Sequence, residues 1–230
     1  MIFKTLLSNF LALFFPDLCV VCREPLLEGE TFLCLHCALK LPKTAYRSYV
    51  NNLSFDRFLG KIPLEKVNSY LYYSKGGIGQ KLVADIKYKG NVSLGKWMGE
   101  CMAKDVLSSG FFDGIDFIVP VPLHPKRLKQ RGYNQSEIIA EGISFVTDIP
   151  LDTKNLFRKK ATATQTKRGI YERWRNTLDI FDLHDRELFA GKHILIIDDV
   201  LTTGSTLEAA AHCILESKGS KVSILTLAVA

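Results

Sequence analysis

No other part of the sequence restricts the fold as strongly as residues 193–206, His-Ile-Leu-Ile-Ile-Asp-Asp-Val-Leu-Thr-Thr-Gly-Ser-Thr. The first five residues are mostly apolar, which favours a buried strand. Two acids, Asp198 and Asp199, follow them, and a loop of hydroxyl residues and one glycine comes next. Residues 207–215 then have strong helix propensity. A strand, a polar loop and a helix in this order are typical of one unit of an α/β fold.

The loop between strand and helix has the composition of a phosphate site. The backbone N–H groups at the start of a helix attract an anion, and the hydroxyls add donors. We therefore predict phosphate contacts from Thr202, Thr203, Gly204, Ser205 and Thr206. The acid pair lies where ligands bind in open α/β sheets and suits the vicinal hydroxyls of a sugar. The alternative is an ordinary buried strand followed by a capped helix.

This order of residues resembles the phosphoribosyl pyrophosphate (PRPP) signature of type I phosphoribosyltransferases. The resemblance implies that Asp198 and Asp199 hold the ribose 2′- and 3′-hydroxyls and that the loop cradles the 5′-phosphate.

Positive charge is concentrated in one region of the chain. Residues 120–175 hold 12 Lys+Arg and 5 Asp+Glu, a balance of +7, whereas the whole chain carries +6. Such a region suits a polyanion, either pyrophosphate or nucleic acid, although a solvated basic face would look the same. Within it, a strand at 116–122 leads into a basic loop at 123–133. We predict that Lys126, Arg127 and Arg131 of this loop form a second anion site, which binds the pyrophosphate of PRPP.

The two anion sites together match the layout of PRPP, and Mg²⁺ is expected to bridge its pyrophosphate and ribose oxygens. A further basic stretch, residues 158–175, is predicted to be a mobile lid or simply an exposed loop. No residue stands out as the base that would activate an acceptor, so we assign no catalytic residue.

Four cysteines form two Cys-x-x-Cys pairs, Cys19 with Cys22 and Cys34 with Cys37. This spacing predicts a zinc site, and four cysteines close its coordination shell, so the zinc is expected to be structural. Two disulfides are the competing interpretation, which a reducing compartment disfavours.

Residues 1–15 are apolar at helical spacing and predict a short amphipathic helix that docks on the protein itself or on a partner. The segment is too short to span a membrane, and no signal peptide or transmembrane span is recognised. We therefore expect a cytoplasmic protein.

The remaining chain alternates strands and helices. We predict strands at 67–73, 116–122, 193–197 and 221–229, and helices at 78–88, 93–107, 134–146 and 207–215. This alternation predicts an α/β fold with a mainly parallel sheet flanked by helices. We divide the chain into an N-terminal helix and zinc-ribbon module at 1–45 and a phosphoribosyltransferase-like domain at 46–230.

Several motifs together resemble the ComF-type competence proteins, a double-zinc-ribbon phosphoribosyltransferase-like family. They are the cysteine pairs, Ile86–Gly90, Val119–Arg127, Arg131–Gln135, Lys160–Gln165 with Arg168, Arg173 and Asn176, and Asp198–Thr206. The resemblance implies a role in natural transformation, where DNA is taken up, and partners in the competence machinery. It favours a protein that binds PRPP or a related phosphosugar. The alternative is a non-enzymatic factor that binds single-stranded DNA through the same phosphate pockets.

Overall fold

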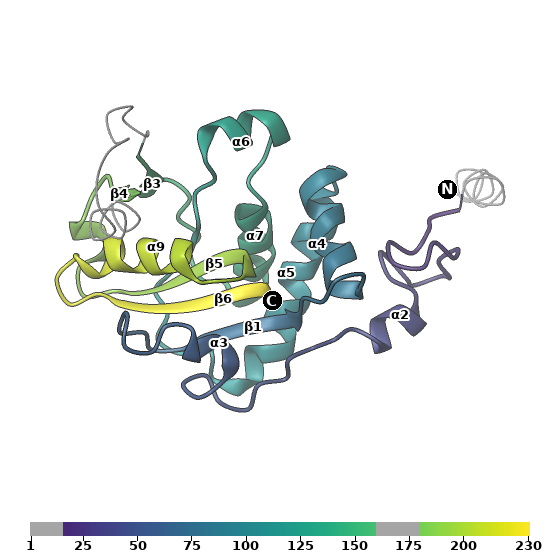
Figure 1. The fold of residues 1–230 in the computed structure, drawn as a ribbon, viewed down its shortest axis with the longest axis horizontal. Helices are drawn as coiled ribbons and strands as arrows, with labels where there is room; N and C mark the ends of the chain where they lie inside the picture. Colours follow the sequence, from purple (N-terminus) through teal and green to yellow (C-terminus); the bar gives the residue numbers. More distant parts are fainter. Residues whose placement is uncertain (1–15, 160–179) are drawn as a thin grey trace.

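The computed structural model describes residues 16–159 and 180–230 (Figure 1). The predicted N-terminal helix at 1–15 and all but the first two residues of the predicted lid lie outside these ranges. The described chain contains a four-stranded parallel sheet with the strand order β1-β6-β5-β2. Its strands are β1 (Val67–Tyr72), β2 (Phe117–Pro120), β5 (His193–Leu201) and β6 (Lys221–Val229). The predicted fold class, a parallel sheet flanked by helices, is confirmed.

The central strand β5 supplies apolar side chains to both faces of the sheet. Because alternate residues of a strand point to opposite faces, Leu195 and Ile197 enter one buried cluster and Ile194 and Ile196 enter the other. Residues of α4 (Ile78–Tyr88), α5 (Val92–Val106) and α7 (Gln135–Thr147) belong to the first cluster, and those of α9 (Ser205–Leu215) to the second. The short elements α3 (Leu53–Asp56), η1 (Leu107–Ser109) and η2 (Glu187–Phe189) complete this part of the chain.

One predicted loop is a helix. Residues 123–133, expected to be an irregular basic loop, contain α6 (Pro125–Arg131). Pro125 takes the first turn, where its missing N–H costs nothing, and the ring nitrogen of His124 accepts the N–H of Lys126. Gly132 ends the helix in the left-handed conformation at φ 83°. The loop prediction was therefore wrong in conformation, and the cations of this segment lie on a helical turn.

A second difference is a small antiparallel pair that the periodicity did not predict. The strands β3 (Leu156–Arg158) and β4 (Phe181–Leu183) each have three residues and pair with each other. Leu156, Phe181 and Leu183 are buried in the cluster that contains α9. The pair therefore packs beside the main sheet rather than extending it.

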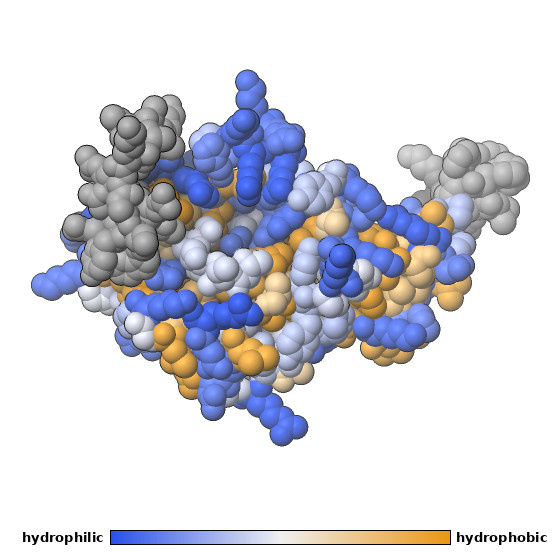
Figure 2. Space-filling view, viewed as in Figure 1, coloured by the Kyte–Doolittle hydropathy of each residue, from blue (hydrophilic) through white to orange (hydrophobic). Residues whose placement is uncertain are grey.

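The cysteine module, residues 17–40 with the helix α2 (Leu35–Leu39), joins the main core. Cys19 and Cys37 are buried in the same apolar cluster as α4 and α5, and the ring of Phe32 lies 5.5 Å from that of Trp97. The exposed surface at this end of the molecule mixes apolar and hydrophilic residues (Figure 2), and Leu27, Leu35 and Leu39 are among the exposed side chains of the module. The proposed division of the chain between residues 45 and 46 stays a prediction.

Candidate functional site

The acid pair lies in the last third of β5, at the carboxyl edge of the sheet. The strand continues past the acids to Leu201, so their backbones are held by strand pairing. Asp198 Oδ1 accepts hydrogen bonds from Ser136 Oγ at 2.8 Å and from the Asp199 N–H at 2.9 Å. Asp199 Oδ2 lies 2.9 Å from Nζ of Lys87, and about four-fifths of each of these two side chains is buried.

The surroundings of Asp198 change its acidity. Burial and the neighbouring charge of Asp199 raise the pKa of Asp198 to about 7, although the hydrogen bonds from the Asp199 N–H and Ser136 and the charge of Lys87 oppose the shift. Asp198 therefore titrates near neutral pH. Its neighbour Asp199 differs in its contacts, because it is paired with Lys87.

The predicted phosphate loop joins the end of β5 to α9, and the side chains of Phe58 and Arg57 lie against it. Gly204 is the N-cap of α9 with φ 84°, and a Cβ placed there would lie 3.1 Å from the ring of Phe58. Arg57 Nη1 donates to the carbonyl of Thr202 at 2.8 Å. The carbonyl of Thr202 therefore points toward Arg57. Residues 202–206 line a hollow at the start of α9.

A cavity of about 340 Å³ joins the acid pair to basic side chains, a volume at the low end of those of small-molecule sites. Asp198, Val200, Thr202 and Thr206 line both this cavity and the hollow of the phosphate loop, so the two spaces are continuous. The four cations that line the cavity come from three segments far apart in sequence: Lys87 from α4, Arg127 and Arg131 from α6, and Arg158 from β3.

Most residues of the predicted site thus lie around one continuous space. Thr203, Gly204 and Ser205 line its loop end, and Arg127 and Arg131 line its basic end. Lys126 is different, because its side chain is exposed on α6 and lines neither space.

The sequence-based prediction of the site missed several lining residues. They include Lys87, Arg158 and three polar residues at the start of α7, Asn134, Gln135 and Ser136. Asn134 fixes this helix start, since its Oδ1 accepts the Ser136 N–H and its Nδ2 donates to the carbonyl of Val121. The Ile86–Gly90 and Arg131–Gln135 motifs contained three of these residues, but only the folded chain brings them beside Asp198 and Asp199.

A second basic cavity of about 660 Å³ adjoins the first and shares Lys87, Arg127 and Arg131 with it. Lys89, Tyr88 and Tyr133 are among its other lining residues. The Arg131 guanidinium lies 5.4 Å from the centre of the Tyr88 ring, and Tyr133 donates a hydrogen bond from its hydroxyl to the carbonyl of Ile86. Figure 2 shows hydrophilic side chains projecting at α6, the helix that supplies part of the lining of this cavity.

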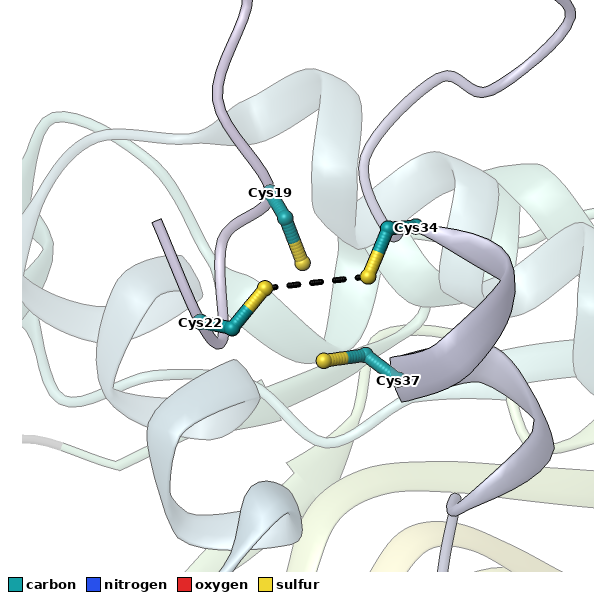
Figure 3. A group of neighbouring side chains, drawn as sticks. All are labelled: Cys19, Cys22, Cys34 and Cys37. Carbon is teal, nitrogen blue, oxygen red and sulfur yellow. Dashed lines mark hydrogen bonds between the residues drawn. The ribbon is translucent and has the colours of Figure 1, made fainter. Parts of the chain in front are cut away.

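The four cysteines of the two predicted pairs point toward one another (Figure 3). Their sulfur atoms all lie within 4.8 Å of one another, and the Sγ atoms of Cys22 and Cys34 are 3.6 Å apart. Burial opposes ionisation of Cys19, but backbone N–H donors outweigh it and lower its pKa to about 6. The cluster can hold a metal ion, because a tetrahedral zinc with bonds of about 2.3 Å separates its sulfurs by about 3.8 Å.

Comparisons with known proteins agree with this arrangement. The family model described as the phosphoribosyl transferase domain matches residues 130–230. The DNA utilization protein YhgH of Escherichia coli K12 is 29% identical over 224 residues, which cover 92% of this chain and 96% of that protein. The competence protein ComFC of Bacillus subtilis is 37% identical over 111 residues, 48% of this chain and 43% of that protein.

The chain is similar to ComF-type, phosphoribosyltransferase-like proteins. The competence protein F of Haemophilus influenzae adds a third relative, 37% identical over 91 residues that cover 39% of this chain and 40% of that protein. The phosphoribosyl transferase match includes the acid pair and the phosphate loop, but it begins after Lys126 and Arg127. Among the described residues, none of the helices has the length and apolarity that crossing a membrane requires.

Proposed function

We propose that this protein binds PRPP or a related phosphosugar, together with Mg²⁺, and acts in the handling of DNA during natural transformation. The observation that carries the proposal is the continuous space that begins at the phosphate loop, passes the acid pair and ends among arginines and a lysine. PRPP presents a phosphate, a pair of ribose hydroxyls and a pyrophosphate in the same order. The names of the relatives, DNA utilization and competence proteins, support the link to DNA uptake.

In this proposal each part of the space has one role. Residues 202–206 bind the 5′-phosphate through backbone N–H groups and hydroxyls. Asp198 and Asp199 accept hydrogen bonds from the ribose hydroxyls. Arg127 and Arg131 bind the pyrophosphate, and Lys126 on the exposed side of α6 attracts it from solvent.

Magnesium fits the ligand better than it fits the protein alone. In the cavity Asp199 contacts Lys87 and Asp198 contacts Ser136, each through one carboxylate oxygen. The phosphate and hydroxyl oxygens of PRPP would supply a larger set of oxygen ligands for the metal. Mg²⁺ would bind the oxygens of PRPP and neutralise the charge that develops on the leaving pyrophosphate. If the protein is catalytic, the bond between ribose C1 and the pyrophosphate oxygen breaks, and an acceptor forms a new bond to C1. Positioning of the substrate and charge neutralisation by the arginines would then account for the rate enhancement.

Calorimetric titration with PRPP and Mg²⁺ tests the proposal. The Asp198→Asn/Asp199→Asn double variant is expected to weaken binding about 100-fold or more, since each hydrogen bond to a charged group contributes about 1.5–3 kcal/mol. Asp113→Asn, an exposed acid on another part of the chain, is the matched control and should bind as wild type does. If wild-type protein takes up no PRPP, the proposal is wrong.

We further propose that the metal of the cysteine module is zinc and that its role is structural. Four thiolates fill a tetrahedral shell and leave no position for substrate. Protein purified without chelator should contain one zinc per chain by elemental analysis, and its thiols should be protected from alkylation. A chain without zinc that contains two disulfides would support the competing interpretation.

One observation favours a second candidate function, a single-stranded DNA-binding factor. The adjoining basic cavity, with Lys89, Arg127, Arg131 and the exposed ring of Tyr88, is suited to a phosphate backbone and a stacked base. Affinity for an oligonucleotide should then fall steeply with added salt. Binding that persists in the Asp198→Asn/Asp199→Asn variant would favour a DNA role independent of PRPP. Such a role would place the protein in the cytoplasm beside other competence proteins.

A further inference from the structure

A polar cavity of about 330 Å³ lies away from the candidate phosphosugar site and shares no residue with it. It is enclosed by β1, by the C-terminal end of α5 with η1, and by the segment 43–49 that joins the cysteine module to the sheet. β1 is the edge strand on the far side of β6 from β5. The cavity is therefore two strands away from the acid pair.

The feature that points to a ligand is Asn68 of β1. Its side chain is only 4% exposed and lines the cavity, and its Oδ1 has no hydrogen-bond partner among the described residues. Side chains two residues apart on a strand point to the same face, so Asn68 shares a face of the sheet with Tyr70. Leu225 of β6, which is in register with Asn68, packs into the apolar cluster on that face. A buried amide oxygen without a partner is unfavourable and rare in folded proteins. An apolar residue would suit this position better, unless a bound group completes the hydrogen bonding of the amide.

The charges around the cavity exclude a strongly charged ligand. Asp105 Oδ2 accepts hydrogen bonds from the Tyr70 hydroxyl at 2.6 Å and from Lys43 Nζ at 2.5 Å. The carboxylate and the ammonium therefore neutralise each other at the wall. This cavity differs in this respect from the two basic cavities near α6, which suit phosphates.

The residues that line the cavity favour a flat ring as the ligand. Three tyrosines, Tyr46, Tyr49 and Tyr70, line the cavity. Tyr49 is fixed in place, because its hydroxyl donates to Ser109 Oγ at 2.6 Å and its ring packs edge-on against Phe111 at 4.8 Å. Ala45 lies in the left-handed region at φ 49°, a strained conformation for a residue with a side chain, and strain of this kind is often found at ligand sites.

We propose that this cavity binds a nucleobase, either free or as an uncharged nucleoside, at a second site separate from the phosphosugar cavity. The Asn68 amide offers one donor and one acceptor in a plane, which matches the adjacent donor and acceptor on the edge of a base. The tyrosine rings supply the stacking surface. Because the site lies away from the acid pair, the base bound there is not an acceptor for the ribose.

The test is calorimetric titration of the full-length protein with adenine, hypoxanthine, cytosine, uracil and their nucleosides at concentrations up to the millimolar range. At least one of them is expected to bind wild-type protein. Asn68→Leu, which keeps the branching and the number of heavy atoms but removes both hydrogen-bonding groups, should weaken that binding about tenfold or more. The same variant should unfold at an equal or higher temperature than ligand-free wild type, because it removes the unpaired amide.

Two further variants make the result decisive. Asp198→Asn/Asp199→Asn should bind the base as wild type does, because its substitutions lie in the phosphosugar cavity. The nucleobase proposal can therefore hold even if the phosphosugar proposal is wrong. Tyr46→Leu, which removes a stacking ring, should weaken binding severalfold even if Asn68→Leu does not fold. The proposal is overturned if no base binds wild-type protein, or if the folded variants at positions 68 and 46 bind the base with wild-type affinity.

Discussion

Gly204 begins α9 with φ 84°, and an added Cβ would lie 3.1 Å from the ring of Phe58. Gly204→Ala should therefore lower the free energy of unfolding by about 1–3 kcal/mol, because it strains the backbone and presses on a buried ring. Urea denaturation measures this loss. The variant should also bind PRPP more weakly, since the loop must shift to make room.

Gly191→Ala is the matched control for this substitution. Gly191 has φ 68°, but nothing lies within 4 Å of an added Cβ there. This variant should carry only the cost of the backbone conformation. Equal losses in the two variants would mean that the contact with Phe58 does not matter.

Asp198 makes the stability of the protein depend on pH. Its pKa is raised to about 7 in the folded protein, against about 4 when unfolded, so the folded state binds the proton more tightly. The free energy of unfolding should therefore fall as the pH rises from about 4 to 7, by up to about 1.4 kcal/mol per pH unit.

Asp198→Asn replaces the titrating carboxyl with an amide. It should therefore remove the fall in the free energy of unfolding between about pH 4 and 7. It should also raise the stability at neutral pH. Urea denaturation of the two proteins at a series of pH values measures the difference. Parallel profiles would contradict the assignment.

The sequence identified the acid pair and the phosphate loop because their residues are contiguous. It did not identify Lys87 as the partner of Asp199, because the two residues are 112 positions apart and meet only in the folded chain. Asn68 likewise reads as an ordinary polar residue of a strand. Only the folded sheet reveals that it is buried without a partner.

The helices α5 and α7 touch through their backbones, and this contact places the start of α7 beside the acid pair. A Cβ on Gly142 would lie 2.0 Å from the carbonyl oxygen of Lys96. Gly142→Ala should separate the two helices and lower the free energy of unfolding by about 1–3 kcal/mol, despite the better helix propensity of alanine.

Gly95→Ala serves as the comparison in this pair of helices, because the atoms nearest its Cβ belong to side chains, with Ile138 Cγ2 at 2.9 Å and Ile86 Cγ2 at 3.4 Å. A side chain moves more easily than a backbone, so the loss should be smaller. Urea denaturation of both variants decides the matter. A smaller loss for Gly142→Ala than for Gly95→Ala would contradict the importance of the backbone contact.

The accuracy of the predicted helices and strands followed the strength of their patterns. The helix predicted at 78–88 agrees with α4, since a glycine precedes it and its apolar residues recur at helical spacing. The helix α6 was missed because only one apolar residue, Leu128, lies among its cations. β3 and β4 were missed because three residues are too few to establish a period of two.

The cysteine module and the sheet share one apolar cluster, so metal and fold should be lost together. Cys19, Val20, Leu33 and Cys37 are all buried in the cluster that contains α4 and α5. Chelation should lower the melting temperature in one cooperative transition rather than release a separate module.

Differential scanning calorimetry with and without chelator measures this effect. The Asp198→Asn/Asp199→Asn variant is the control and should show the same shift, because its substitutions lie outside the module. An unchanged melting temperature after verified metal loss would contradict the prediction.

For the molecule as a whole, the alternation of strands and helices was enough to predict a parallel sheet. It was not enough to predict the strand order, because sequence pattern does not say which strands pair. The order β1-β6-β5-β2 places the first strand of the sheet beside the last, and only the structure reveals this.

This order has a consequence for synthesis on the ribosome. Within the described sheet β1 pairs only with β6, and Val67 is in register with Ile224. At about 5–20 residues per second, the intervening stretch of about 150 residues takes on the order of ten seconds to translate. During this time the nascent chain holds β1 without a neighbouring strand. The sheet is therefore completed late in synthesis. Both proposed ligand sites reach their final arrangement only then.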